Sequence, residues 1–152
     1  MESIALFPGS FDPITKGHVD IINRSINLFE KIIVGVGINS GKQPMFDVDQ
    51  RVTWINEIFK NNSKVEAQAY EGLTINFCKK IGANFILRGV RYVSDFEYEK
   101  GIADMNRILA GDIETFFLTS SPEYSTVSST LVRDVIRHGG DVRIFLPDEV
   151  QW

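Results

Sequence analysis

The sequence predicts an α/β protein: a single Rossmann-like domain over residues 1–152, with about five parallel strands and helices on both faces of the sheet. Two observations support this prediction. Short apolar runs, several rich in β-branched residues, alternate along the chain with segments whose apolar residues recur at helical spacing. No internal repeat, low-complexity tract or linker interrupts the alternation, and 152 residues are enough for one buried core.

Five apolar runs are the expected strands. Residues 4–7 (IALF) form a short buried strand, and residues 31–38 (KIIVGVGI) are almost wholly apolar, as expected of a central parallel strand covered on both faces. Residues 65–69 alternate between apolar and polar side chains, which is typical of a less buried edge strand. Residues 85–87 and 115–119 supply the remaining two strands. In a parallel sheet, ligands bind at the carboxyl ends of such strands.

A helix is expected after each strand, because apolar residues recur there at helical spacing. A further short helix is expected after Pro147, near the end of the chain. The residues expected on the helical faces are Val19, Ile22, Ile26 and Phe29; Val52, Ile55 and Phe59; Leu73, Phe77 and Ile81; Tyr98, Ile102, Met105 and Leu109; and Leu131, Val132, Val135 and Ile136.

Polar residues predict where three of these helices begin. Asp47 with Gln50 resembles a capping box, and Ser94 with Glu97 could cap the helix that follows residues 85–91. Residues 128–130 (SST) form a cluster of residues that favour the N-cap of the last long helix.

Composition excludes several classes of protein. The net charge of −4 does not provide a general basic surface for nucleic acid. The single cysteine, Cys78, excludes an intramolecular disulfide framework and a multi-cysteine metal site. No apolar run approaches membrane length, and the N-terminus lacks a secretory signal pattern. We therefore expect a cytoplasmic protein that binds neither nucleic acid nor membrane.

The rest of the chain is organised around residues 7–18 (FPGSFDPITKGH). An apolar strand breaks there into a glycine-containing turn, and a helix begins near Gly17. The unpaired amides of the first helical turn, together with the helix dipole, favour an anion at such a turn. His18 lies in the first helical turn, where its ring can reach the same anion. No covalent nucleophile is obvious, so the segment predicts a phosphate-handling site.

Two cations and a second hydroxyl-rich turn belong to the same predicted rim. Lys42 and Arg88 follow the ends of central strands, which places them beside Ser10 and suits a phosphate monoester. Taken alone, each would be a solvated surface charge. Residues 124–130 (YSTVSST), with Arg133 one turn later, predict a second phosphate cradle at a helix N-terminus. His138 precedes two glycines, where a capping role is expected.

Two of these segments carry a family resemblance. Residues 9–18 resemble the (H/T)-x-G-H signature of the nucleotidyltransferase superfamily, and residues 127–133 (VSSTLVR) are similar to its I-S-S-T-x-x-R signature. Thr15 at the first signature position and residues 88–91 (RGVR) resemble the bacterial phosphopantetheine adenylyltransferases. The resemblance covers essentially the whole chain, although the chain stops soon after Pro147.

The resemblance implies reversible transfer of the adenylyl group of ATP to 4′-phosphopantetheine, by direct in-line attack without a covalent intermediate. It makes His18 the stabiliser of the transition state. It implies that the acceptor is bound by Ser10, Lys42, Thr74 and Arg88. It implies that ATP is bound by Ser10, Phe11, His18, Gly89, Val90, Arg91, Glu99, Tyr124, Ser125, Thr126, Val127, Ser128, Ser129 and Thr130.

The resemblance also implies Mg²⁺ bound with ATP rather than in a protein metal site, a homohexamer, and coenzyme A as a feedback inhibitor. Several alternatives stay open at this point. Asp12 could organise the turn or bind magnesium; Arg91 could pair with Asp95 or Glu99; and Glu99 could contact the nucleotide or orient an arginine. The enzyme could use another phosphate acceptor, or the chain could be a nucleotide sensor without activity.

Overall fold

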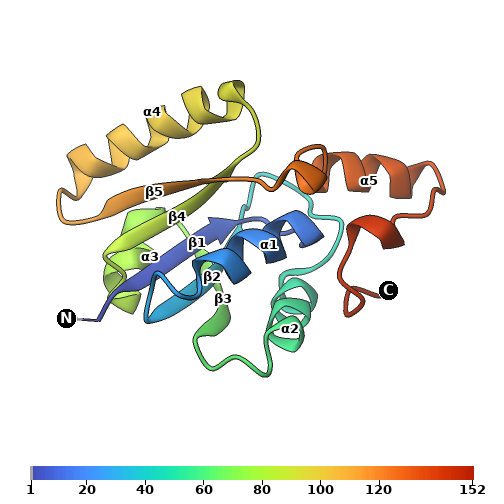
Figure 1. Ribbon diagram of the computed structural model, residues 1–152, viewed down its shortest axis with the longest axis horizontal. Coiled ribbons are helices and arrows are strands. Elements are labelled where there is room, and N and C mark those ends of the chain that lie inside the picture. The colour runs from blue at the N-terminus through green and yellow to red at the C-terminus, as the bar shows by residue number, and fades with distance from the viewer. Residues whose placement is uncertain (1) are drawn as a thin grey trace.

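The computed structural model describes residues 2–152 and shows one five-stranded parallel sheet flanked by helices (Figure 1), which confirms the predicted fold class. The strands are β1 (Ile4–Gly9), β2 (Lys31–Ile38), β3 (Val65–Glu71), β4 (Phe85–Val90) and β5 (Glu114–Thr119). The helices are α1 (Lys16–Ser25), α2 (Val48–Ile58), α3 (Thr74–Ile81), α4 (Val93–Leu109) and α5 (Ser129–Arg137), with 3₁₀ turns η1 (Pro122–Tyr124) and η2 (Arg143–Phe145).

The strand order β3-β2-β1-β4-β5 places the switch in topology between β1 and β4 and leaves β3 at an edge, as its alternating sequence predicted. The pairing of β1 with β2 continues to Gly9 and Val36, whereas its pairing with β4 ends at Leu6 and Ile86. Strands β1 and β4 therefore separate toward their carboxyl ends. In open parallel sheets this is where ligands bind.

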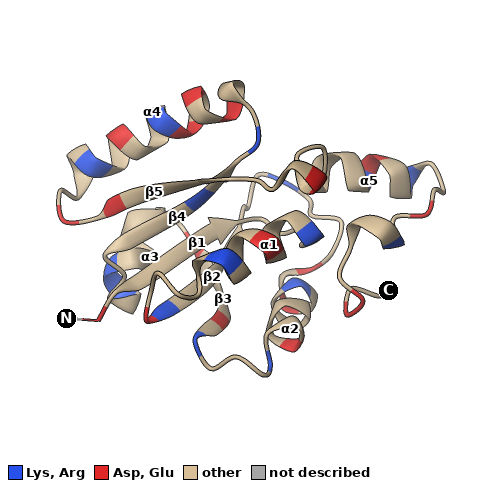
Figure 2. Ribbon diagram, in the orientation of Figure 1, with Lys and Arg blue, Asp and Glu red and all other residues tan. Residues whose placement is uncertain are grey.

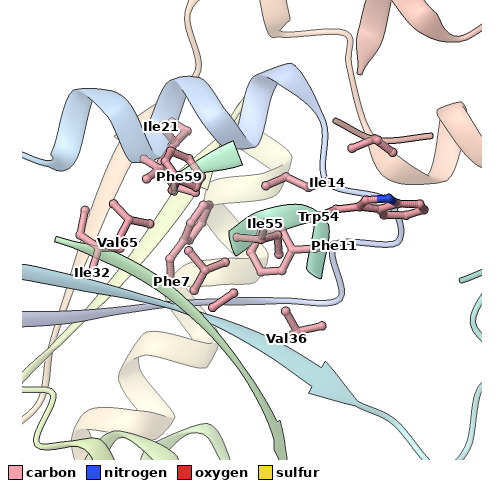
Figure 3. Packing of buried hydrophobic residues seen from close by; sticks show 14 of the residues in the cluster. Phe7, Phe11, Ile14, Ile21, Ile32, Val36, Trp54, Ile55, Phe59 and Val65 are labelled. Atoms are coloured by element: carbon pink, nitrogen blue, oxygen red, sulfur yellow. The ribbon is translucent and has the colours of Figure 1, made fainter. Parts of the chain in front are cut away.

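One face of the sheet is covered by α1 and α2 (Figure 3). Phe7 of β1 and Ile32 of β2 point into this layer, where Ile21 of α1 and Ile55 of α2 meet them. All four side chains are at most 4% exposed. At about 1.5–3 kcal/mol for each fully buried apolar side chain, this layer is a major source of stability for the turn that follows β1.

The opposite face carries α3, which packs its Ile75, Phe77 and Cys78 against Leu6 and neighbouring strand residues. Burial raises the pKa of the Cys78 thiol to about 11, which leaves it protonated and unreactive. The prediction that Leu73 lies on the buried face of this helix was wrong. Leu73 is the N-cap residue and is 61% exposed, because the helix begins one residue later.

Helix α4 lies on the same face as α3 but stands away from the sheet. The structure describes all of its residues, and only Glu99 is buried. Tyr98, Met105 and Leu109 keep the expected helical spacing, yet they are 72%, 61% and 59% exposed. The predicted Ser94–Glu97 cap is also wrong: Tyr92 is the N-cap, and the Asp95 carboxylate accepts hydrogen bonds from the Arg91 and Tyr92 amides.

Two of the predicted caps are confirmed. Asp47 accepts a hydrogen bond from the Gln50 amide at 2.8 Å, and Ser128 accepts one from the Leu131 amide at 3.2 Å. The predicted helix after Pro147 does not form. The Val150 amide bonds to the Pro147 carbonyl in a turn instead, and Val150 is buried in the main core.

Both acidic and basic residues occur along α4 and on several of the other elements (Figure 2). Within the described part of the chain, no helix is long and apolar enough to cross a membrane.

Candidate active site

The turn between β1 and α1 holds its residues in a strained arrangement. Phe11 has a φ of +48°, a left-handed conformation that bulky side chains rarely adopt. Its ring packs edge-on against Phe7 and His18, with centroid separations of 5.4 and 5.0 Å. A Cβ atom at Gly9 would lie 3.0 Å from the Phe11 ring, so a larger residue there would press on the ring. The surrounding contacts therefore fix the turn rather than leave it mobile.

His18 is held in one tautomer by Thr15, the N-cap residue of α1. The Thr15 amide donates a hydrogen bond to Nδ1 of His18 at 3.0 Å. Because a backbone amide can only donate, Nδ1 is the acceptor and the ring proton lies on Nε2. Desolvation, followed by the charges of Arg88 and Arg91, lowers the pKa of His18 from 6.5 to about 4. At neutral pH the ring is therefore an uncharged hydrogen-bond donor.

Arg88 is oriented by Glu99, the buried residue of α4. The guanidinium donates to both carboxylate oxygens of Glu99, at 2.8 and 2.5 Å, in a bidentate pair. It also donates to the Pro8 carbonyl in β1. Arg91 pairs with Asp95 at 3.3 Å, so of the two partners considered for Arg91 the structure selects Asp95. Glu99 orients an arginine in this structure.

Two clefts open at the carboxyl ends of the strands and share a wall. The first, of about 610 Å³, lies between α3 and α4 and includes Thr74. The second, of about 640 Å³, lies between α1, α4 and α5 and includes His18 and Lys42. Residues common to both clefts are Pro8, Gly9, Ser10, Arg88 and Glu99. This arrangement can hold two ligands whose ends meet at Ser10 and Arg88.

The second cleft gathers most of the residues predicted to bind ATP: Ser10, Phe11, His18, Gly89, Arg91, Glu99, Tyr124, Val127, Ser128, Ser129 and Thr130. Three others line neither cleft. Val90 is buried and its carbonyl accepts a hydrogen bond from the Ser120 amide. The Ser125 hydroxyl donates to the Pro122 carbonyl, and Thr126 is exposed.

The start of α5 is docked against the β1–α1 turn. The Ser129 hydroxyl donates to the Pro13 carbonyl at 2.7 Å, and Nη1 of Arg133 donates to the Asp12 carbonyl at 2.8 Å. These bonds join segments more than a hundred residues apart in sequence and bring both predicted anion sites to one cleft.

Asp12 organises the turn and does not present a free carboxylate. Its two oxygens accept hydrogen bonds from the amides of Met45 and Phe46, at 2.8 and 2.9 Å. Of the two roles considered for Asp12, the geometry favours the structural one. Among residues 2–152 no group of three or more His, Cys, Asp or Glu side chains could hold a metal ion.

Sequence reasoning missed Arg51 and the role of Thr15. Arg51 reaches the turn from α2, with Nη1 2.6 Å from the Ser10 carbonyl. In the sequence Arg51 lies among polar helical residues and carries no signal that separates it from a solvated charge. Thr15 could have been recognised as an N-cap because it stands three residues before His18 at a helix start.

Comparison with known proteins agrees with this geometry. Residues 6–135 match the cytidylyltransferase-like family, which places the chain among the nucleotidyltransferases. A solved bifunctional NMN adenylyltransferase/ADP-ribose pyrophosphatase from Francisella tularensis shares the fold, with a TM-score of 0.73 at 15% identity. That match covers 96% of this chain, which spans 45% of the longer protein.

Curated relatives narrow the family. The chain is 53% identical over 147 residues to the phosphopantetheine adenylyltransferase of Flavobacterium psychrophilum, covering 97% of each chain. It is 50% identical over 150 residues to the enzyme of the same name from Leptospira biflexa, covering 99% of this chain and 94% of the relative. This chain belongs to the phosphopantetheine adenylyltransferase family, which confirms the resemblance seen in its signatures.

Proposed function

We propose that this chain transfers the adenylyl group of ATP to 4′-phosphopantetheine, giving 3′-dephospho-coenzyme A and pyrophosphate in coenzyme A biosynthesis. The observation that carries the proposal is the pair of clefts that share Ser10 and Arg88, in a chain about half identical to relatives with this name. The acceptor occupies the α3–α4 cleft, and ATP occupies the cleft lined by His18. The two phosphates meet at the shared wall.

The reaction needs alignment and charge stabilisation rather than a protein nucleophile. An oxygen of the acceptor phosphate attacks the α-phosphorus of ATP, and the bond from that phosphorus to the pyrophosphate oxygen breaks. The acceptor phosphate is already anionic near neutral pH, so no strong base is required. Holding two mutually repelling anions in line supplies most of the rate. No adenylyl-protein intermediate forms.

His18 is proposed to donate from Nε2 to the α-phosphate, where negative charge develops. Its neutral state at pH 7 and its fixed tautomer support this role. A donor held in place before the reaction costs no reorganisation in the transition state.

Arg88 and the Ser10 hydroxyl are proposed to hold the acceptor phosphate at the shared wall, and Lys42, which lines only the second cleft, to reach that phosphate from the ATP side. Thr74 is proposed to contact the pantetheine arm. Arg88 is already oriented by Glu99, and Ser10 is exposed on the shared wall. Thr74 lines the first cleft but not the second, and its hydroxyl lies 3.1 Å from the Tyr70 hydroxyl.

The remaining ATP contacts are proposed to come from Gly89, Arg91, Tyr124 and residues 127–130, which line the second cleft. The amides at the start of α5 face a cleft, which suits the leaving pyrophosphate. ATP is taken as its Mg²⁺ complex, with the ion carried on the triphosphate. The engaged carboxylates support this, since Asp12, Asp95 and Glu99 are each already hydrogen-bonded to protein groups.

A homohexamer is proposed as the assembled form, with α4 packed against another copy of the chain. The support is the apolar surface that α4 leaves uncovered, including Val93, Met105 and Ile108 at 76%, 61% and 82% exposure. We also propose a cytoplasmic location, which suits the substrates. Coenzyme A, which contains the same pantetheine arm, is proposed to inhibit by occupying the first cleft.

The test is pyrophosphate release from ATP and Mg²⁺ by the purified protein, with 4′-phosphopantetheine, nicotinate mononucleotide or glycerol 3-phosphate as acceptor. We expect release only with 4′-phosphopantetheine. Release only with another acceptor would be consistent with the roles proposed for His18 and the ATP cleft, but it would contradict the proposal that the first cleft binds 4′-phosphopantetheine. Tight ATP binding without release from any acceptor would identify a sensor instead.

A further inference from the structure

Arg51 is a buried arginine that the proposed reaction does not use. It lies in the first half of α2 and is only 4% exposed. A buried guanidinium is costly unless its donors are matched by acceptors. Here the acceptors are three backbone carbonyls: Nε donates to Phe46 at 2.9 Å, and Nη1 donates to Ser10 at 2.6 Å and to Gly37 at 3.4 Å.

These three carbonyls belong to three different parts of the site. Ser10 lies in the turn after β1, Gly37 near the end of β2, and Phe46 at the end of the loop that carries Lys42. Asp12 completes the network from the other side, because its carboxylate accepts hydrogen bonds from the amides of Met45 and Phe46. Two buried, charged side chains, Arg51 and Asp12, therefore join the turn after β1 to residues 45 and 46 at the end of the Lys42 loop.

The network ends beside the groups that would hold the acceptor phosphate. The Ser10 side chain is exposed on the wall shared by the two clefts, while its own carbonyl is bonded to Arg51. Residues 39–44, which include Lys42, are all exposed. The bonds to residues 45 and 46 are thus the buried contacts that tie this loop to the turn.

We propose that Arg51 is a positioning residue for adenylyl transfer: acting through the Ser10 turn and the Lys42 loop, it sets their separation and so aligns the acceptor phosphate with the α-phosphorus. The inference rests on the proposed function, since it deepens the account of the same site. Asp12 is its partner in this role.

The ATP side of the site has anchors that do not involve the Arg51 side chain. His18 is fixed by Thr15 within α1, and the hydroxyl cluster of α5 is docked on the turn through Ser129 and Arg133. Loss of Arg51 is therefore expected to weaken use of the acceptor and to leave the affinity for ATP nearly unchanged. A general loss of folding would affect both substrates alike.

The experiment compares Arg51→Gln, Arg51→Lys and Asp12→Asn with the wild-type protein in steady-state kinetics with ATP and 4′-phosphopantetheine. We expect Arg51→Gln to lower kcat/KM for the acceptor by about 10- to 100-fold, since small misplacements of reacting groups have effects of that size. KM for ATP should change less than about twofold. Arg51→Lys keeps the charge and one donor direction, so it should recover part of the loss. Asp12→Asn should reproduce the direction of the effect.

A double-mutant cycle separates positioning from a simple loss of stability. If Arg51 acts through the Lys42 loop, Lys42→Ala should cost less in the Arg51→Gln background than in the wild type. Arg143→Gln is the matched control, because Arg143 is exposed and pairs with the nearby Asp141. Additive effects, equal losses for both substrates, or unchanged kinetics in Arg51→Gln would each overturn the inference.

Amide hydrogen exchange at Met45 and Phe46 tests the network without any assay of activity. Exchange at both amides should be faster in Arg51→Gln and Asp12→Asn than in the wild type and in Arg143→Gln. Unchanged exchange would overturn the inference even if the enzyme were active. If exchange were faster in the variants but the wild-type protein adenylylated no acceptor, the result would support the Arg51 network and contradict the proposed function.

Discussion

The two segments that follow β1 and β2 approach the same cleft but differ in how firmly they are held. The β1–α1 turn, residues 10–15, is bonded by Arg51, Arg133, Ser129 and its own Thr15, and most of it is buried. The loop after β2, residues 39–44, is exposed throughout, and its local hydrogen bonds run from the amides of Gly41 and Lys42 to oxygens of Asn39.

The difference matches two different tasks. Groups that stabilise developing charge on the α-phosphate act best when they are fixed before the reaction, because no reorganisation is then needed. A loop that receives an incoming acceptor must leave a path open. The comparison therefore predicts that changes in the turn reduce turnover, whereas changes in the exposed loop weaken acceptor binding.

The largest expected effect comes from the fixed turn. His18→Ala should lower kcat by about 100- to 1,000-fold, the usual result of removing one preorganised donor to a developing anion. KM values should change much less, because the contact strengthens as charge develops. Steady-state pyrophosphate release measures both quantities. His138→Ala, at the exposed C-cap of α5, serves as the control and should keep full activity. A purified His18→Ala protein with near-normal turnover would remove His18 from the mechanism.

The exposed loop should give a different kinetic signature. Lys42→Ala should raise KM for 4′-phosphopantetheine by about tenfold, with a smaller loss in kcat, since it removes one charged hydrogen bond to phosphate. Acceptor titrations at saturating ATP measure the effect. Lys60→Ala, which removes an exposed lysine paired with Glu57, is the matched control. Unchanged acceptor affinity would place Lys42 away from the phosphate.

Glu99→Gln tests the ion pair that holds Arg88 in the wall shared by the two clefts. The amide keeps one acceptor for Arg88 but loses the charge and one bond of the bidentate pair. We expect a loss of about 1–2 kcal/mol in the free energy of unfolding, measured in urea, and a rise of a few fold in acceptor KM. Glu97→Gln, on the exposed side of α4, should leave both unchanged. Equal stability of the two variants would mean that the pair contributes nothing to the fold.

The pH dependence of stability tests the environment of His18 itself. The folded-state pKa of His18, about 4, lies below its ordinary value of 6.5, so the unfolded chain binds more protons between these values. Neutral His18 thus contributes stability above pH 6.5 that is lost as pH falls toward 4. In His18→Gln the free energy of unfolding should fall less steeply between pH 6.5 and 4 than in the wild type. Parallel curves for the two proteins would contradict the lowered pKa.

The parts of this fold that could be predicted depend on local sequence. The apolar runs of β2 and β4, the glycine-containing turn before His18 and the Ser128 cap each follow from neighbouring residues, and the structure contains all of them. Most residues that line the second cleft were predicted from the family signatures. Such signatures indicate which residues form a site, but not which protein groups those residues contact.

What could not be predicted depends on which face of an element meets the rest of the protein. Helix α4 has apolar residues at helical spacing, but its buried residue is Glu99, because the helix meets the sheet through the ion pair with Arg88. The role of Arg51 was invisible for the same reason: its carbonyl partners come from segments 5 to 41 residues away. Periodicity identifies a helix without identifying what covers it.

The most direct test of the central claim is to quantify both products in one reaction. Purified wild-type protein would be incubated with ATP, Mg²⁺ and 4′-phosphopantetheine, with 3′-dephospho-coenzyme A measured by mass spectrometry and pyrophosphate by a coupled assay. The account predicts that the two products form in equal amounts and that no adenylyl group remains on the protein. Pyrophosphate without 3′-dephospho-coenzyme A, or label from ATP retained on the protein, would contradict it.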